Sequence, residues 1–363
     1  MKVYYDYQIC CFQKYGGISR YFYDLICHIK KQQLANVDIR CIFSKNVYFE
    51  DFFNKEAVQK YPFAMSSVIS LINKLYVLFF VSRDFDIIHP TYYETYILKK
   101  KNKNSKLVIT VYDMIHEEFS DMFSLFDRTT QKKKKMIQNA DHIIAISENT
   151  KKDILKYYPD ISSDKISVIY IGCSFKPNNK IDLKERFPQK FILFVGRREG
   201  YKNYKRFWQA IRPLLIEDNK LHLVCIGGEK FTIEERKSMG NLQNRVMQMD
   251  ANDDYLSYAY MNAECFVFPS LYEGFGIPTL EAFACGCPVV LSDTSSMPEV
   301  AGDAGVYFNP EDEQDMRKKI AYVLNNKDEQ KRLVEKGYQQ LKKFQWEKIA
   351  SQIVNCYQKI LDD

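Results

Sequence analysis

Short apolar runs alternate along this chain with longer segments whose apolar residues recur at helical spacing. Such alternation is typical of repeated β-α-β units, in which parallel strands form a sheet and the intervening helices cover it. The first half of the chain contains six candidate strands: Val3–Ile9, Asp38–Phe43, Ile87–His89, Leu107–Val111, His142–Ile146 and Ile166–Tyr170. Between the first two, residues 18–29 carry apolar side chains at helical spacing and predict an amphipathic helix.

The same pattern starts again after a polar, loop-like segment at residues 173–189. Six further candidate strands follow: Phe191–Val195, Leu221–Ile226, Val246–Met249, Cys265–Pro269, Pro288–Ser292 and Gly305–Phe308. A chain of 363 residues is long enough for two domains. We therefore predict an α/β protein of two doubly wound, Rossmann-like domains, residues 1–175 and 176–345. We expect ligands at the carboxyl ends of the strands, in an interdomain cleft.

The cysteines and the first residues bear on the cellular compartment. Ten cysteines are scattered along the chain without a CxxC pair, so the sequence supports neither a zinc site nor a thioredoxin motif. The chain leads directly into a predicted strand and shows no apolar signal-peptide core. We therefore expect a cytoplasmic protein with free thiols.

The whole net charge of +6 lies in the first half of the chain. Residues 1–175 contain 25 basic and 19 acidic side chains, whereas residues 176–363 contain 27 of each. The excess lies mainly in two lysine-rich runs, Lys99–Lys106 and Lys132–Lys135. A solvated loop is one interpretation of each run. Both runs lack the interleaved aromatic residues and the motif of a nucleic-acid site, so we expect no nucleic-acid partner.

The longest apolar stretch, Val68–Ser82, is short for a membrane span and contains Asn73 and Lys74. It is either a helix packed on its own domain or a helix lying on a membrane surface. Together with the lysine-rich runs, it suggests that the first domain meets anionic lipid headgroups as a peripheral protein of the inner face of the cell membrane.

The stretch Phe268–Asp293, FPSLYEGFGIPTLEAFACGCPVVLSD, is the most informative about chemistry. It begins as a buried strand, continues into a loop with Gly274 and Gly276, and reaches Pro278 where a helix should start. A strand, a glycine loop and a helix amino terminus together suit an anion such as a diphosphate.

Two acids, Glu273 and Glu281, lie on either side of this turn. A carboxylate does not bind phosphate, but it accepts hydrogen bonds from sugar hydroxyls. The two acids therefore fit the polyol groups that flank a diphosphate in a nucleotide-sugar. Two solvated acids would have the same spacing, and the spacing alone leaves both interpretations open.

The segment EGFGIPTLEAFACGCPVV, from Glu273 to Val290, resembles the signature of retaining GT-B glycosyltransferases, in particular the large family 4. Residues 298–312, PEVAGDAGVYFNPED, resemble the segment that follows it in that family, and the resemblance covers nearly the whole chain. It implies that Glu281 binds the donor ribose and that Glu273 contacts the transferred sugar. It also implies that backbone N–H groups line the sugar and diphosphate pocket, namely those of Phe275, Gly276, Ile277, Thr279 and Leu280.

Two further elements match the family. Gly196, Arg197 and Lys202 lie in FVGRREGYKN, and the resemblance implies that the two cations stabilise the charge on a departing diphosphate without a metal. Gly16 and Gly17 follow the first strand, where the family carries a glycine pair near the donor phosphate and the acceptor.

The fourth candidate strand is followed by a departure from the family pattern. Many relatives have a histidine there that touches the transferred sugar, and this chain has Tyr112 instead. His116 lies four residues further on, so Tyr112 and His116 are both candidates for this contact. Ser147 is placed to cap a helix. The last helix, about residues 346–363, resembles the family's element that crosses back onto the first domain.

The resemblance therefore implies a retaining, metal-independent hexosyltransferase without a cofactor. Residues 15–22 and 113–117 resemble surface-polysaccharide mannosyltransferases, which implies GDP-mannose as the nucleotide-sugar donor and a glycan or lipid-linked glycan as acceptor. The alternatives are a UDP-hexose donor, a nucleotide-sugar epimerase on the same fold, and a non-catalytic sugar-binding module. A metal-dependent GT-A enzyme that uses Asp84 and Asp86 is a further alternative.

Overall fold

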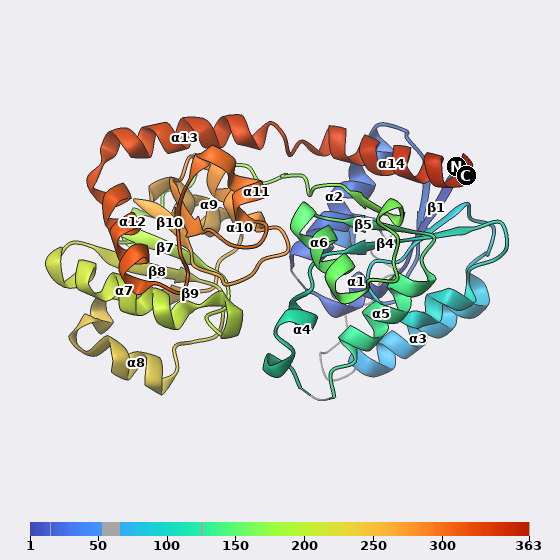
Figure 1. Cartoon of the computed structure of the whole chain (residues 1–363), viewed down its shortest axis with the longest axis horizontal. Helices are drawn as coiled ribbons and strands as arrows, with labels where there is room; N and C mark the ends of the chain where they lie inside the picture. The colour runs from blue at the N-terminus through green and yellow to red at the C-terminus, as the bar shows by residue number, and fades with distance from the viewer. Residues whose placement is uncertain (15, 53–65, 125, 363) are drawn as a thin grey trace. The chain divides into compact units, whose positions relative to one another are not determined.

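The computed structural model describes the following residues: 1–14, 16–52, 66–124 and 126–362 (Figure 1). The chain divides into two compact units, which are Met1–Gly172 with Gln345–Asp363, and Cys173–Phe344. Each unit contains one six-stranded sheet, and its neighbouring strands pair in parallel. The predicted α/β class with two doubly wound domains is confirmed.

In the first unit the strands lie in the order β2-β1-β3-β4-β5-β6. Their bounds are β1 Lys2–Tyr5, β2 Asn36–Ile39, β3 Ile87–His89, β4 Lys106–Val111, β5 His142–Ala145 and β6 Ile166–Val168. The α-helices are α1 Gln8–Phe12, α2 Gly17–Lys31, α3 Ser66–Phe80, α4 Ile115–Glu118, α5 Thr129–Asn139, α6 Glu148–Tyr157 and α14 Trp346–Asp362. Ser147 caps α6 as predicted, because its Oγ accepts the Thr150 N–H at 3.0 Å.

In the second unit the strands lie in the order β12-β11-β10-β7-β8-β9. Their bounds are β7 Phe191–Val195, β8 His222–Ile226, β9 Val246–Met249, β10 Cys265–Phe268, β11 Val289–Ser292 and β12 Gly305–Phe308. The α-helices are α7 Tyr204–Glu217, α8 Ile233–Met239, α9 Asp253–Asn262, α10 Ile277–Ala284, α11 Met297–Ala301, α12 Glu313–Asn325 and α13 Lys327–Leu341.

All twelve predicted strands are present, and two of them differ clearly in extent. β1 ends at Tyr5, because the next residue, Asp6, is buried in a hydrogen-bond network. β2 pairs with β1 over Asn36–Ile39 only. The predicted continuation to Phe43 is held instead by Asn73, whose Oδ1 accepts the Phe43 N–H at 3.2 Å.

Each sheet has one point at which the strand order reverses. In the first sheet it lies between β1 and β3, and in the second sheet between β7 and β10. In open parallel sheets, ligands bind outside the carboxyl ends of the strands at this point. The loops that follow these four strands are therefore the places where a ligand site is expected.

The terminal helix α14 belongs to the first unit and packs against α2. The large apolar side chains that recur at helical spacing along α14 are all buried: Trp346, Ile349, Ile353, Tyr357 and Ile360. Gly172 lies against the Trp346 ring, and a Cβ at this glycine would be 2.4 Å from the ring. The close approach of α14 therefore depends on a glycine where the chain leaves the first unit.

A buried chain of polar side chains also joins α14 to the sheet. The Tyr357 hydroxyl lies 2.6 Å from Nδ1 of His89 and 2.9 Å from the hydroxyl of Tyr5. Nε2 of His89 lies 2.9 Å from Oγ1 of Thr110. Burial lowers the pKa of His89 to about 3, so its imidazole is neutral at pH 7.

We expect acid to destabilise the first unit through His89. The unfolded histidine titrates near its ordinary pKa of 6.5, whereas the folded one stays neutral down to about pH 3. The unfolded state therefore binds the extra proton between these values, and the free energy of unfolding should fall as the pH falls through this window. His89→Gln should flatten this dependence. It should also lower the stability at pH 7 by about 1–3 kcal/mol, because two buried hydroxyls lose a partner.

Urea unfolding at several pH values measures both effects. An unchanged slope in His89→Gln would contradict the prediction.

Candidate functional site

The loop after β10 ends in a helix whose N-cap residue supplies no side-chain cap. α10 begins at Ile277, and its N-cap Gly276 has a φ of +91°, in the left-handed region that favours glycine. Pro278 lies in the first turn, as predicted. The Thr279 N–H donates to the Gly276 carbonyl at 2.9 Å, and no described residue partners the buried Thr279 hydroxyl. This amino terminus has the character of an anion site.

Two other predicted pocket residues, Phe275 and Leu280, have buried side chains on either side of this turn. The Phe275 ring packs edge to face on Phe344, with 5.7 Å between ring centres. The Leu280 carbonyl accepts a weak hydrogen bond from the Cys173 thiol at 3.7 Å. These contacts fix the backbone on both sides of the glycine turn.

Glu273 and Lys202 form an ion pair between the loops that follow β10 and β7. Nζ of Lys202 lies 2.6 Å from Oε1 of Glu273, and the two side chains are only 19% and 11% exposed. The Leu271 N–H donates to the Tyr201 carbonyl at 2.7 Å, so the two loops are also joined through their backbones. Two groups that were predicted to contact different parts of a ligand thus contact each other.

The backbone of Glu273 is held from the loop after β11. Its N–H donates to Oγ of Ser295 at 2.9 Å, and the Ser296 hydroxyl donates to its carbonyl at 2.8 Å. Ser295 has a φ of +51°, a left-handed conformation that costs a non-glycine residue about 1–3 kcal/mol. The surrounding structure therefore fixes the position of Glu273 at the expense of local strain.

Glu281 lies one turn into α10, and as a whole residue it is as buried as Glu273. The Tyr260 hydroxyl donates to Oε2 of Glu281 at 3.3 Å. Burial raises the pKa of Tyr260 well above its ordinary value, and the charge of Glu281 raises it further, so this hydroxyl remains a donor. The interpretation of the two acids as solvated side chains is therefore wrong.

β7 is followed by a glycine and two arginines that differ in their surroundings. Gly196 has a φ of +130°, and the next residue, Arg197, is exposed without a hydrogen-bond or ion-pair partner in the described part of the chain. Arg198 is anchored instead, with Nε 2.7 Å from Oε1 of Glu235 and its guanidinium 4.4 Å from the centre of the Phe231 ring. Arg197 is thus the arginine whose charge is free to meet a ligand.

In the first unit, α2 begins at Gly17, with Gly16 as its N-cap. The Gln13 side chain packs on Gly16 and accepts the Ser19 N–H at 3.3 Å through its amide oxygen. The first turn of α2 is therefore already partly capped, and an anion that binds there would replace the Gln13 oxygen.

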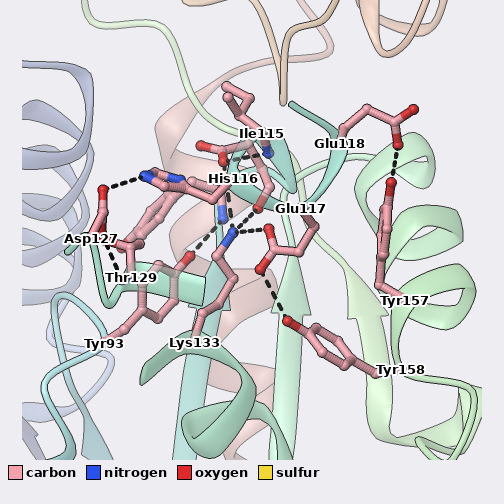
Figure 2. A network of polar contacts seen from close by, with 12 residues as sticks. Tyr93, Ile115, His116, Glu117, Glu118, Asp127, Thr129, Lys133, Tyr157 and Tyr158 are labelled. Atoms are coloured by element: carbon pink, nitrogen blue, oxygen red, sulfur yellow. Dashed lines mark hydrogen bonds and ion pairs between the residues drawn. The ribbon is translucent and has the colours of Figure 1, made fainter. Parts of the chain in front are cut away.

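Tyr112 and His116 follow β4, at the carboxyl edge of the first sheet. Tyr112 is buried, and its hydroxyl donates to the Thr91 carbonyl at 3.2 Å. His116 lies on α4 and stacks on Phe123, with 4.0 Å between ring centres. Its Nε2 is 3.4 Å from Oδ2 of Asp127 (Figure 2), and no described residue bonds its buried Nδ1. Of the two candidates, His116 retains the unpartnered polar atom.

A buried ion pair beneath α4 was missed by the sequence analysis. Nζ of Lys133 lies 2.7 Å from Oε2 of Glu117, and these side chains are 1% and 4% exposed (Figure 2). The Tyr158 hydroxyl donates to Oε1 of Glu117 at 3.0 Å. The interpretation of the whole run Lys132–Lys135 as solvated is therefore wrong for Lys133. Its helical spacing with the buried Met136 was the available signal.

Asp6 is a further buried acid, and nothing in its sequence neighbourhood predicts this. It lies at the point where the first sheet reverses its order, and its Oδ1 accepts the Thr91 N–H at 2.9 Å. Its Oδ2 accepts from the Tyr96 hydroxyl at 2.9 Å and from the Gln8 amide at 2.5 Å. Burial raises the pKa of Asp6, while these hydrogen bonds oppose the increase. The carboxyl group joins the loops that follow β1 and β3.

Asp84 and Asp86, the acids of the GT-A alternative, precede β3 and lie at the amino end of the first sheet. The Lys2 ammonium is 2.5 Å from Oδ2 of Asp84, and the Lys2 N–H donates to Asp86 at 2.7 Å. Among the described residues, no three His, Cys, Asp or Glu side chains are grouped so as to hold a metal ion.

Removing one partner of the Lys202–Glu273 pair should destabilise the second unit. In Lys202→Met the Glu273 carboxylate stays buried without its cation, which should lower the free energy of unfolding by about 1–3 kcal/mol. The double variant Lys202→Met/Glu273→Gln should recover part of this loss. Urea unfolding measures both.

The matched control is Lys190→Met, which breaks the 2.7 Å pair with Asp218. Those side chains are 36% and 35% exposed, so the loss should stay below about 1 kcal/mol. Equal losses in Lys202→Met and Lys190→Met would show that burial of the Glu273 pair has no special effect.

Two family models match consecutive stretches of the chain. The model of Glycosyltransferase Family 4 matches residues 15–174, and the model of Glycosyl transferases group 1 matches residues 175–340. O-antigen chain mannosyltransferase B of Escherichia coli is 29% identical over 234 residues, which cover 61% of each chain. O-antigen chain mannosyltransferase RfbU of Salmonella typhimurium is 30% identical, over 52% of this chain and 53% of its own. The matched region thus spans less than two thirds of these relatives.

Two solved structures resemble the chain over almost its whole length. Sucrose-phosphate synthase from Thermosynechococcus elongatus has a TM-score of 0.75 at 18% identity, with 99% of both chains covered. Anabaena Alr3699/HepE, in complex with UDP and glucose, has a TM-score of 0.75 at 16% identity with the same coverage. These likenesses show the GT-B fold. Residues 15–174 thus belong to Glycosyltransferase Family 4 and residues 175–340 to the Glycosyl transferases group 1, on a chain with the GT-B fold.

Proposed function

We propose that this protein is a retaining, metal-independent hexosyltransferase. Its reaction would move mannose from GDP-mannose to a glycan or lipid-linked glycan during surface-polysaccharide synthesis. The observation that carries the proposal is the grouping at one sheet edge of the second unit: a helix amino terminus, two buried carboxylates and two cations. The curated relatives described as O-antigen chain mannosyltransferases support mannose as the sugar and a polysaccharide as the product.

In this proposal the donor binds along the carboxyl edge of the second sheet. The diphosphate meets the amino terminus of α10, Glu281 accepts hydrogen bonds from the ribose, and Glu273 accepts them from the hexose. The ion pair holds the Glu273 carboxylate in place and uses much of the Lys202 charge. Arg197, which no described residue engages, supplies the remaining positive charge to the departing diphosphate.

The first unit contributes the acceptor side of the reaction in this proposal. The roles that we propose for its residues are those that the family resemblance implies: Gly16 and Gly17 would serve the acceptor and the donor phosphate, and His116 or Tyr112 would serve the transferred sugar. The carboxylates of Glu273 and Glu281 have partners in the protein and would hold sugar hydroxyls in this proposal, so neither serves as a nucleophile. An oxygen of the departing diphosphate takes the proton of the acceptor hydroxyl, and the protein positions the reacting groups.

A UDP-hexose donor is the second candidate, because the structural neighbour HepE is described in complex with UDP and with UDP-glucose. An epimerase would use the same donor site without an acceptor. We further propose that the enzyme works in the cytoplasm, at the inner face of the cell membrane, where a lipid-linked acceptor would be presented.

Thermal unfolding with a panel of nucleotide-sugars should identify the donor. GDP-mannose at about 100 times its Kd should add about 2.7 kcal/mol of stability. Transfer to an acceptor should release GDP at the same rate with and without EDTA. Stabilisation by UDP-sugars alone would favour the second candidate, and sugar interconversion without acceptor would reveal an epimerase. Loss of activity in EDTA would contradict metal independence.

Arg197→Ala should lower kcat by about 10²–10³-fold, because the developing charge on the diphosphate loses a donor. Stability should change little, since the side chain is exposed. Lys205→Ala, which removes an exposed cation at the start of α7, is the matched control and should retain full activity. Steady-state kinetics test this, and an unchanged kcat in Arg197→Ala would refute its assigned role.

A further inference from the structure

The helix α3 presents large apolar side chains to solvent. Six of them are between 37% and 76% exposed: Val68, Leu71, Ile72, Leu75, Phe79 and Phe80. We call these six residues the α3 apolar face. Apart from Phe80 in the last turn, they follow the spacing i, i+3, i+4, i+7 and i+11, so they share one side of the helix. Contiguous exposed apolar residues of this kind mark an interaction surface.

The opposite side of α3 shows why the apolar face points outward. Ile69 and Val77 are buried, and the fully buried Asn73 lies between them. Oδ1 of Asn73 accepts the Ile42 N–H at 2.8 Å, and its amide donates to the Phe43 carbonyl at 2.9 Å. The helix cannot turn the apolar face inward without leaving these buried polar groups unpaired. α3 thus carries apolar side chains on its exposed side as well as on its buried side, whereas an ordinary surface helix exposes polar side chains.

Basic residues adjoin the carboxyl end of the α3 apolar face. The Lys100 ammonium donates to the Val81 carbonyl at 2.5 Å, and the Asn102 amide donates to the Arg83 carbonyl at 2.6 Å. These two contacts tie residues 99–103 to the chain just after the helix.

We call residues 99–103 and the chain just after α3 the basic corner. Three of its cations are exposed and pair with no acid in the described part of the chain: Arg83, Lys99 and Lys103. Among the described residues, the acids near them are Asp84, Asp86 and Asp141, and Asp86 accepts the Lys2 N–H at 2.7 Å. The other two form ion pairs. Asp84 lies 2.5 Å from the Lys2 ammonium, and Asp141 lies 2.6 Å from the Lys101 ammonium. Residues 66–83 contain no acid. The corner therefore carries a surplus of positive charge.

We propose that the α3 apolar face docks on the surface of an anionic lipid bilayer. Its side chains enter the boundary between headgroups and acyl chains, and Arg83, Lys99 and Lys103 meet the headgroup phosphates. α3 lies along the surface of the first unit (Figure 1), and no helix in the described ranges is long and apolar enough to cross a bilayer. A second copy of this face would bring the same surplus charge and be repelled, which favours lipid as the occupant.

If the enzyme uses a lipid-linked acceptor, as the proposed function on which this role rests requires, the surface would bring it to that substrate. The docking itself depends on α3 and the basic corner rather than on the donor site. A vesicle-binding measurement contains neither donor nor acceptor, so its failure and the failure of the proposed transfer reaction are distinguishable.

The test is co-sedimentation of the full chain with vesicles of phosphatidylcholine alone or mixed with phosphatidylglycerol. We expect about tenfold tighter binding to the anionic vesicles. Phe79→Ser/Phe80→Ser should weaken that binding about tenfold or more. Lys99→Gln/Lys103→Gln should remove most of the preference for anionic vesicles. The control is Ile216→Ser/Ile233→Ser, which changes residues of the second unit that are 62% and 74% exposed, and it should bind as the wild type does.

The proposal is overturned if the wild type stays in the supernatant, or if Phe79→Ser/Phe80→Ser binds as well as the wild type. A wild-type dimer that this variant dissociates, measured by light scattering without vesicles, would instead assign the face to a second copy. Circular dichroism checks that each variant is folded, as expected for changes at exposed positions. Retained transfer to a short water-soluble acceptor by Phe79→Ser/Phe80→Ser would separate docking from catalysis.

Discussion

Parallel pairing of β7 with β10 is the constraint on which the chemistry of the second unit depends. Because both strands end at the same edge of the sheet, the loops that follow them meet although 71 residues separate Lys202 from Glu273. Within the sheet, β8 and β9 lie on one side of β7, and β10 lies next to β7 on its other side. In open parallel sheets ligands bind where the strand order reverses, and the amino terminus of α10 follows one of the two strands at this point.

The ion pair between Lys202 and Glu273 shapes the electrostatics of this sheet edge. A buried pair repays its desolvation only when its geometry is good, and Glu273 is held through its carboxylate and through its backbone. The pair is neutral as a unit, so the local positive potential comes from α10 and from Arg197. In the proposed reaction, charge is therefore concentrated where the diphosphate departs, and the sugar is held by fixed acceptors.

Much of this arrangement could be predicted from the sequence, for identifiable reasons. Buried parallel strands read as continuous apolar runs, and Gly276 and Pro278 mark a turn into a helix whatever lies around them. The pairing of Lys202 with Glu273 could not be predicted, because it depends on which strands become neighbours. Periodicity groups the residues of α3 on faces but does not say which apolar face is inside, and the buried hydrogen bonds of Asn73 decide it. The inward position of Lys133 is explained only by a partner, Glu117, on another helix.

The place of α14 has a consequence for how the protein is made. The first unit lacks one of its helices until the entire second unit has been synthesised, because Tyr5 and Tyr357 meet across 352 residues of sequence. Domains usually fold in the order in which they emerge from the ribosome, but here the amino-terminal unit must wait for the last residues of the chain. During that interval the surfaces of α2 and β4 that α14 covers stay uncovered. A stop codon before Trp346 would therefore damage the unit that was translated first.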